Sequence, residues 1–386
     1  KGSHLRAIVL FSAIVFLIKV IWLSSQQGRG LLGADGENYL NALSGLLEDG
    51  LFSEQGLLSY WPAGYPILMW PLAELSFTNL AFLVGTLQSF IFAVSVILFS
   101  FELSKSSLKK FTWPAVLILS LSPTFTLNSV VIGYEVTSAV LFLLVISLYM
   151  RLIRIEKRSI LNWECSLAAL AISVSCFMQP RIILLALGLF IPFAIYHYRG
   201  RAIPLFLAFS IFLVAIAPAI LIFRNTQAQG FAAISTNLGV TMNIGGGDEA
   251  TGGYNGKYNG VDCPEAVGNE AEVDSAKVRC ILNWYAKNPV KFLKLSWNKA
   301  RFFWSPWFGP EASGTMARNP WRINHPLNET IKTPDGANMV NGGFGRAISW
   351  LWMISGLIFL GLGFRFLWSA GGLERLWGSA AFSMVI

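Results

Sequence analysis

The residues best suited to chemistry lie in one acidic stretch near the N-terminus. Between Gly33 and Pro66 the chain carries several carboxylates and neither Lys nor Arg. They are Asp35, Glu37, Glu48, Asp49 and Glu54. Apolar segments long enough to cross a membrane flank this stretch on both sides. A carboxylate held at a membrane surface can act as a general base toward a hydroxyl group, so this stretch is the first candidate for an active site.

Asp35 and Glu37 are the two candidate bases, and each residue of this region also has a structural interpretation. Asp35 precedes a helix-compatible segment over 37–51, so its carboxylate is also suited to cap that helix. Tyr39 lies one helical turn from Asp35, where it can orient the carboxylate, contact a substrate or anchor the chain at the membrane interface. A rigid aromatic turn over 61–66 follows, and 67–75 is predicted to form a second surface or re-entrant helix.

The composition places the chain among membrane proteins. Of its 386 residues 54% are hydrophobic and 13% are charged, whereas soluble domains carry about 25% charged residues. On a membrane protein the net charge of +8 is explained by cytoplasmic loops and contact with membrane lipid, so we expect no nucleic-acid partner.

The apolar runs predict an all-α polytopic membrane protein. The expected spans are 5–23, 79–101, 111–131, 136–150, 166–178, 182–198, 202–223 and 347–368, with an incomplete ninth span over 376–386. Residues 5–223 then form a seven-span core with an acidic outer loop over 24–78. Residues 224–346 form a polar, loop-rich domain, and 347–386 hold the C-terminal spans. Lys19 interrupts the first span near its far end, where its side chain is expected to snorkel toward the interface.

The distribution of Lys and Arg predicts the orientation. The short loops after the second, fourth and sixth expected spans hold Lys105, Lys109, Lys110, Arg151, Arg154, Lys157, Arg158, Arg199 and Arg201. The short connections on the other side hold only Arg29 and Arg181. By the positive-inside rule the N-terminus is cytoplasmic. The acidic loop, Glu135, Arg181 and the domain over 224–346 are then extracytoplasmic, and the protein is expected in the plasma (inner) membrane.

Four motifs in a fixed order resemble those of one known family. The first is Asp35-x-x-x-Tyr39, and the second is the PAGYP turn over 62–66. The third combines Glu135, at the start of the fourth span, with QPR over 179–181, at the start of the sixth. The fourth combines RN over 224–225, ISTNLG over 234–239 and GGGDEATG over 245–252. Together they resemble the GT-C glycosyltransferases, in the bacterial branch of the protein O-mannosyltransferases and the lipid A aminoarabinose transferase.

Two departures from the family pattern are visible. Gly36 separates Asp35 from Glu37, where the family often has adjacent Asp and Glu. Pro180 precedes Arg181, where the family usually has Arg followed by Pro. Both departures leave the exact base and the exact phosphate contact open.

The resemblance implies a GT-C-like helix bundle with its acidic site in the first extracytoplasmic loop. It implies an inverting transferase that moves a sugar from a polyprenyl-phosphate donor to a hydroxyl of a glycan, lipid or protein acceptor. Asp35 is then the general base, with Glu37 as second choice. The implied substrate-binding residues are Tyr39, Tyr65, Glu135, Arg181, Arg224 and Asn237. Lys299 is a further candidate because it stands before the aromatic run over 302–304, and it equally suits the solvated face of a helix. Arg181 and Arg224 are the candidate phosphate contacts, and Glu135 is as well suited to pairing with an arginine.

The resemblance implies no cofactor, since mannosyltransferase-like relatives generally work without a metal. The acidic loop could nevertheless hold a divalent cation, although no cluster with metal-ligand spacing is visible in the sequence. A transporter or flippase of lipid-linked saccharides is the alternative function, since it would share the many spans. The nearly uncharged spans, the absence of an internal repeat and the long outward segment favour the enzyme.

Two of the cysteines lie in the predicted outer domain. Cys263 and Cys280 would face the oxidising side of the membrane, where they could form a disulfide across the loop between them.

Overall fold

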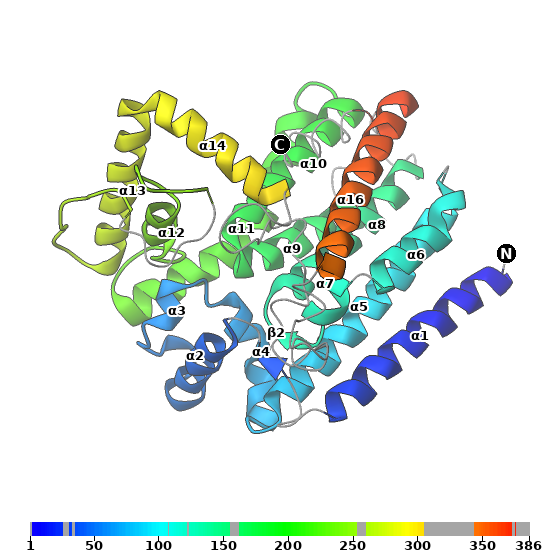
Figure 1. Cartoon of the computed structure of the whole chain (residues 1–386), viewed down its shortest axis with the longest axis horizontal. Helices are drawn as coiled ribbons and strands as arrows, with labels where there is room; N and C mark the ends of the chain where they lie inside the picture. Colours follow the sequence, from blue (N-terminus) through cyan, green and yellow to red (C-terminus); the bar gives the residue numbers. More distant parts are fainter. Residues whose placement is uncertain are drawn as a thin grey trace. The chain divides into compact units, whose positions relative to one another are not determined.

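The computed structural model describes residues 2–25, 31–32, 35–106, 108–121, 123–154, 162–252, 260–304, 343–372 and 375. This part of the chain is mostly helical (Figure 1). It divides into two compact units, Lys1–Gly230 and Phe231–Ile386. Within the described residues five helices are long and apolar enough to cross a membrane. The general prediction of a mostly helical chain with several helices suited to crossing a membrane is therefore confirmed.

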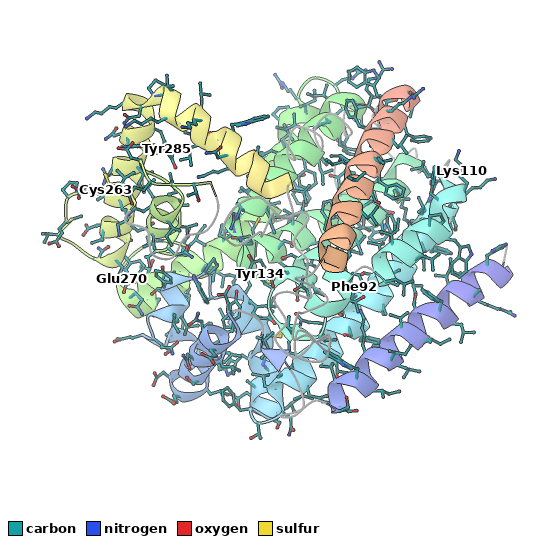
Figure 2. The ribbon with its side chains drawn as sticks, in the orientation of Figure 1. Phe92, Lys110, Tyr134, Cys263, Glu270 and Tyr285 are labelled. Atoms are coloured by element: carbon teal, nitrogen blue, oxygen red, sulfur yellow. A yellow bond between two sulfur atoms is a disulfide. The ribbon has the colours of Figure 1, made fainter. Side chains whose placement is uncertain are left out.

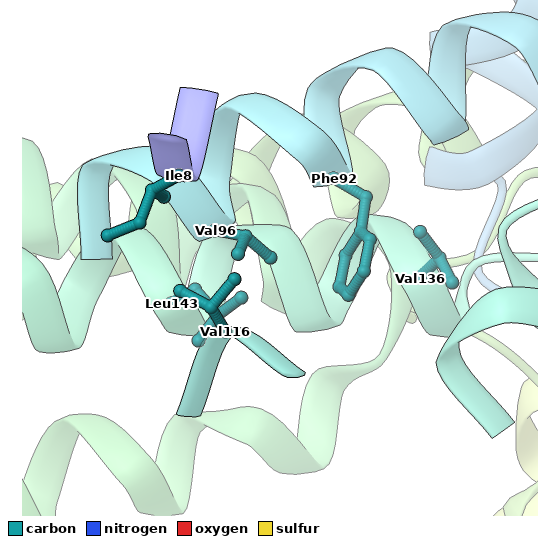
Figure 3. Packing of buried hydrophobic residues seen from close by; sticks show 6 residues of the cluster. All are labelled: Ile8, Phe92, Val96, Val116, Val136 and Leu143. Atoms are coloured by element: carbon teal, nitrogen blue, oxygen red, sulfur yellow. The ribbon is translucent and has the colours of Figure 1, made fainter. Parts of the chain in front are cut away.

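The first unit is built on a row of neighbouring helices. They are α1 (Gly2–Ser25), α5 (Leu80–Ser104), α8 (Glu135–Arg154), α9 (Trp163–Met178) and α11 (Ala202–Gln229). Each packs on the next in this order, and α10 (Ile183–His197) packs on α11 and α9. Branched and aromatic side chains fill the space between α1, α5, α8 and the helix α6 (Thr112–Leu121), where Phe92, Val96 and Val136 are nearly inaccessible (Figure 3). This apolar packing fixes the helix ends that carry the polar residues.

The third expected span is not one continuous helix. Its residues form α6 (Thr112–Leu121), α7 (Pro123–Asn128) and a short strand, β2 (Val131–Ile132). A short 3₁₀ turn, η3 (Lys109–Phe111), precedes α6. Pro123 is the first residue of α7, a position that suits proline because the first N–H groups of a helix have no partner within it. The prediction of a single span over 111–131 is therefore wrong.

Other boundaries differ less. The sixth expected span is found over η4 (Pro180–Ile182) and α10, whereas α9 has 16 residues and is short for a membrane span. The seventh span continues past 223 to Gln229, because the predicted stopping point, Arg224, lies inside the helix. The eighth expected span lies within α16 (Gly343–Ala370). The incomplete ninth span over 376–386 lies outside the described residues.

The acidic loop folds into short helices. They are α2 (Gly36–Asp49), the 3₁₀ turn η2 (Gly50–Phe52), α3 (Leu57–Tyr60) and α4 (Gly64–Leu75). The helix predicted over 37–51 is confirmed by α2, which buries one face including Tyr39, Leu43 and Leu46. The helix predicted over 67–75 begins earlier, at Gly64.

The two ends of α8 carry charges of opposite sign, basic at the last turn and acidic at the first residue. At its last turn Arg151 pairs with Glu164 at 3.2 Å, and Arg154 pairs with Glu102 at the end of α5. At its first residue stands Glu135. A helix of 20 residues is about 30 Å long, so the basic cluster and Glu135 are separated by the thickness of a hydrocarbon layer.

The second unit is described by α12 (Leu238–Ile244), α13 (Glu270–Lys287), α14 (Pro289–Trp304) and α16. The described part of 224–346 is thus more helical than the loop-rich domain that the sequence predicted. A capping box between Asn269 and Glu272 starts α13. The carboxylate of Asp274 accepts a 2.7 Å hydrogen bond from the Gly239 N–H and so joins α13 to α12.

A disulfide joins Cys263 to Cys280 in α13; Cys263 is labelled in Figure 2. It ties the segment that precedes α13 to the middle of that helix. Cys165 and Cys176, in the first unit, are buried free thiols.

Candidate active site

A short parallel strand pair brings the acidic loop to the start of α8. β1 (Leu31–Leu32) pairs with β2 in register, Leu31 with Val131 and Leu32 with Ile132. Asp35 follows β1 by three residues, and Glu135 follows β2 by three. Gln88 in α5 supports the pair because its side-chain amide donates a 2.7 Å hydrogen bond to the Val131 carbonyl. The strand pair therefore holds the two carboxylates at one end of the first unit.

Asp35 occupies the N-cap position of α2 without capping it. The structure shows no side-chain capping hydrogen bond from Asp35, and the side chain is exposed. Glu37, in the first turn of the same helix, is exposed as well. The capping role weighed for Asp35 is thus not observed, and both carboxylates are accessible.

Aromatic side chains form one wall beside Asp35. The Tyr39 ring lies 4.8 Å from the Tyr65 ring and 5.5 Å from the Trp61 ring, centroid to centroid. The Tyr65 hydroxyl accepts a 2.8 Å hydrogen bond from the Gly133 N–H and lies 3.3 Å from the Gln88 side-chain oxygen. Tyr39 and Tyr65 are both buried. Two of the predicted substrate-binding residues thus lie side by side next to the predicted base.

Burial fixes the protonation of these phenols. It raises the pKa of Tyr39 and of Tyr65 well above the usual value, and the negative charge of Glu135 adds to the shift in both. The charge of Asp35 acts on Tyr39 in the same direction. Both phenols therefore stay protonated at neutral pH, which leaves carboxylates as the groups able to accept a proton.

Tyr134 and Gln179 link the carboxylates to Arg181. Burial is the largest cause of the raised pKa of Tyr134. The charges of Glu135 and Asp35 raise this pKa further, whereas the charge of Arg181 lowers it. All three charges thus act on one phenol, which Figure 2 labels. With its side-chain oxygen facing its neighbours, Gln179 accepts hydrogen bonds from the Tyr134 hydroxyl at 2.9 Å and from Arg181 at 2.8 and 3.2 Å. Arg181 itself is exposed.

The PAGYP turn is fixed against α9 by close backbone packing. A β-carbon at Gly64 would collide with the carbonyl of Phe177, near the C-terminal end of α9. Gly64 starts α4, which positions Tyr65. The glycine is therefore needed for the close approach that places the aromatic wall beside 179–181.

Arg224 does not lie where the phosphate prediction requires. Its side chain is fully buried. Its guanidinium donates to the carbonyls of Leu51 and Leu58, each at 3.1 Å, to the Ser53 carbonyl and to the Asn225 side-chain oxygen at 2.8 Å. The side chain is buried and these bonds use four of its five N–H groups, so Arg224 holds the segment after α2 in place and is left out of the proposed phosphate site.

Lys19 also departs from expectation. Its side chain does not snorkel but is buried, and its ammonium donates a 2.9 Å hydrogen bond to Ser129 and lies 5.1 Å from the Phe92 ring centroid. One ionisable group is therefore buried within α1.

Asn237 and Lys299 belong to the second unit. Asn237 stands at the N-cap position of α12, and its side-chain oxygen lies 3.4 Å from the Ser235 hydroxyl. Lys299 lies in α14, with its ammonium beside Gly245. Their proposed contacts with substrate stay predictions. No group of three or more His, Cys, Asp or Glu side chains that could hold a metal is present among the described residues.

Sequence reasoning did not select Tyr134, Gln179, Trp61 or Gln88 as site residues. Gln179 stands inside the third motif, Trp61 directly precedes the PAGYP turn, and Tyr134 directly precedes Glu135. The available signal for Tyr134 was its position between Gly133 and Glu135 at the start of an apolar helix. Gln88 carried no such signal, because its role depends on a strand that the sequence does not predict.

No family model, curated protein or solved structure matches this chain. A function must therefore be inferred from the residues and their geometry.

Proposed function

We propose that this protein is an inverting glycosyltransferase that moves a sugar from a polyprenyl-phosphate donor to an acceptor hydroxyl, with Asp35 as the general base. The observation that carries the proposal is that a strand pair brings Asp35 and Glu135 together, where Gln179 accepts hydrogen bonds from Tyr134 and Arg181 beside a wall of aromatic rings. The resemblance of the ordered motifs to the GT-C glycosyltransferases agrees with it.

The proposed reaction is a single displacement. The acceptor oxygen forms a bond to the anomeric carbon as the bond from that carbon to the phosphate oxygen breaks. The hydroxyl proton passes to the Asp35 carboxylate, and polyprenyl phosphate leaves with the bonding electrons. One carboxylate is enough for this chemistry, whereas retaining hydrolases need two. No metal or cofactor is required.

Arg181 is the proposed contact for the leaving phosphate. It is an exposed cation near the carboxylates, and the Gln179 oxygen accepts from two of its nitrogens and so limits its orientation. A fixed positive charge stabilises negative charge as it develops on the leaving group. The buried Arg224 is left out of this role.

The aromatic wall is the proposed sugar-binding surface. Trp61 is half-buried, so its ring can meet the apolar face of a sugar, whereas the buried rings of Tyr39 and Tyr65 support it from behind. With the N-terminus cytoplasmic, as the positive-inside rule predicts, this end of the unit faces the extracytoplasmic side. The acceptor would then be a glycan, lipid or protein of the cell envelope.

The test is an in vitro reaction with purified protein in lipid nanodiscs. A panel of polyprenyl-phosphate sugars (mannose, glucose, galactose, arabinose and aminoarabinose) is supplied with a mixed hydroxyl acceptor fraction, and release of free polyprenyl phosphate is followed. Release with one donor is expected. Donor binding without release under any acceptor condition would contradict the enzyme.

A transporter or flippase of lipid-linked saccharides remains the second candidate, and one observation favours it. Lys19 is buried inside α1, and carriers keep ionisable groups within their spans. Movement of a labelled donor across the bilayer without formation of product would favour this function, and loss of that movement in Lys19→Met would tie it to the buried amine.

A further inference from the structure

One helix of the second unit is strongly amphipathic and keeps an apolar stripe in solvent. In α14, Val290 is 78% exposed, and Leu293 and Trp297 are each 67% exposed. Their spacing of three and four residues puts all three on one side of the helix. Exposed apolar residues in such a stripe indicate a binding surface more strongly than scattered ones do.

The opposite side of α14 is the side that packs within its own unit. Leu295 is buried, and the Phe292 ring lies 4.8 Å from the Tyr285 ring of α13. Because these contacts already hold the helix, the stripe is not needed for the packing of the second unit.

The charge on α14 has one sign. The helix contains Lys291, Lys294, Lys299 and Arg301 and no acidic residue. Lys291 is paired with Asp248, in the segment that follows α12, at 2.7 Å. Helical periodicity places positions 294 and 301 on the same side as Trp297, and Lys294 is exposed. An apolar stripe with a tryptophan and flanking cations is the pattern of a helix that lies in a membrane interface, because the ring sits at headgroup level and the cations meet lipid phosphates.

We propose that α14 lies in the membrane interface, with Val290, Leu293 and Trp297 among the lipid chains and the basic positions of the same side, Lys294 first, facing anionic headgroups. The occupant of the stripe is thus a lipid surface rich in acidic phospholipid, and not a second protein. The cations favour an anionic lipid surface, because an apolar protein surface would leave their charges unpaired. The inference does not depend on the proposed function.

The cysteine inventory makes a depth measurement straightforward. Cys165 and Cys176 are buried, and Cys263 is bonded to Cys280. An added exposed cysteine is therefore the most reactive thiol for a spin label. Leu293→Cys places the label in the stripe, and Val267→Cys, at a residue that is 100% exposed, is the aqueous reference in the same unit. The full chain is used in nanodiscs made with or without phosphatidylglycerol, and each label is tested against oxygen and a water-soluble nickel complex.

The label at position 293 is expected to be more accessible to oxygen than to the nickel complex, and the label at 267 to show the reverse. Removing phosphatidylglycerol, or adding Lys294→Glu, is expected to raise nickel accessibility at 293 about fivefold or more. Nickel accessibility at 293 equal to that at 267 in both lipid mixtures would overturn the proposal. Low accessibility to both reagents would mean that protein covers the stripe, and would also overturn it. A lipid-facing label that is insensitive to both charge changes would overturn the role of the anionic headgroups.

Discussion

Asp35 and Glu135 lie a hundred residues apart in the chain, yet each follows a paired residue of the same two-strand bridge by three positions. The bridge is parallel and in register, so the two chain segments leave it side by side. The charges of both carboxylates act on Tyr39 and on Tyr134. This relationship brings the acidic loop and the start of α8 together, as the proposed site requires.

Replacing Arg181 tests the proposed phosphate contact. Arg181→Ala is expected to raise the KM for the donor by about 10- to 100-fold, the equivalent of one lost charge-assisted hydrogen bond. Gln179→Leu is expected to have a smaller effect in the same direction, because it frees the Arg181 side chain without removing its charge. KM is measured from initial rates of polyprenyl phosphate release.

The matched control is Arg199→Ala. Arg199 is exposed and follows the C-terminal end of α10. Its replacement therefore removes the same charge at a position away from the candidate site. An equal rise in KM for the two variants would mean that the effect is one of net charge, against a specific role for Arg181.

Gly64→Ala tests the packing of the PAGYP turn. Because the added methyl group would collide with the Phe177 carbonyl, the free energy of unfolding is expected to fall by about 1–3 kcal/mol. Thermal unfolding in detergent measures it. Gly56→Ala is the control, since a β-carbon there meets open space, and it should leave the midpoint unchanged or slightly raised. Equal midpoints for the two variants would show that the close approach is not present.

Arg224→Met tests the structural role of that residue. It leaves the carbonyls of Leu51, Ser53 and Leu58 without their donor, so a loss of about 3 kcal/mol in unfolding free energy is expected. Protease cleavage between α2 and α3 should become faster. The control is Gln229→Leu, which removes one exposed hydrogen bond to the Glu54 carbonyl and should change the free energy of unfolding little. A variant with wild-type stability but weak donor binding would instead restore Arg224 as a substrate contact.

The pH dependence of stability follows from the buried phenols. Burial raises the pKa of Tyr65 above its usual value, which is about 10. Below that value the phenol is protonated in both the folded and unfolded states, so it adds no pH dependence. As the pH rises above about 10 only the unfolded state loses the proton, and stability falls by about 1.4 kcal/mol per pH unit for each such tyrosine.

Tyr65→Phe is therefore expected to flatten the fall in stability above pH 10 and to leave the profile between pH 7 and 9 unchanged. Denaturant unfolding at each pH provides the measurement. A mutant whose alkaline slope matches that of the wild type would show that the Tyr65 phenol ionises freely in the folded protein.

Features that repeat along the chain were predictable from the sequence. The length of the apolar runs predicted the helices of the first unit, and the leucine periodicity predicted α2. The break at Pro123 was signalled by the proline, but the apolar composition on either side concealed it. A two-residue strand pair is too short to produce an alternating pattern, so the bridge that joins the two halves of the site was not predictable.

Roles that depend on distant contacts were also beyond sequence reasoning. An arginine near the end of an apolar run looks the same whether it faces solvent or a buried loop. Arg224 proved to bond carbonyls more than 160 positions earlier in the chain, whereas Arg181 is exposed. The aromatic wall could be predicted only in part, since Tyr39 and Tyr65 stood in motifs but their contact with each other depends on the packing of α2 against α4.

The most direct test of the account compares Asp35→Asn with Glu37→Gln in the donor-release assay, with donor binding measured on the same preparations by thermal shift. Both variants remove one exposed carboxylate near the start of α2, so they change net charge and local helix stability to a similar extent. With Asp35 as the base, Asp35→Asn should bind the donor normally and lose about 10²- to 10⁴-fold in rate, while Glu37→Gln stays close to wild type. Transfer by Asp35→Asn at the wild-type rate would contradict the central claim.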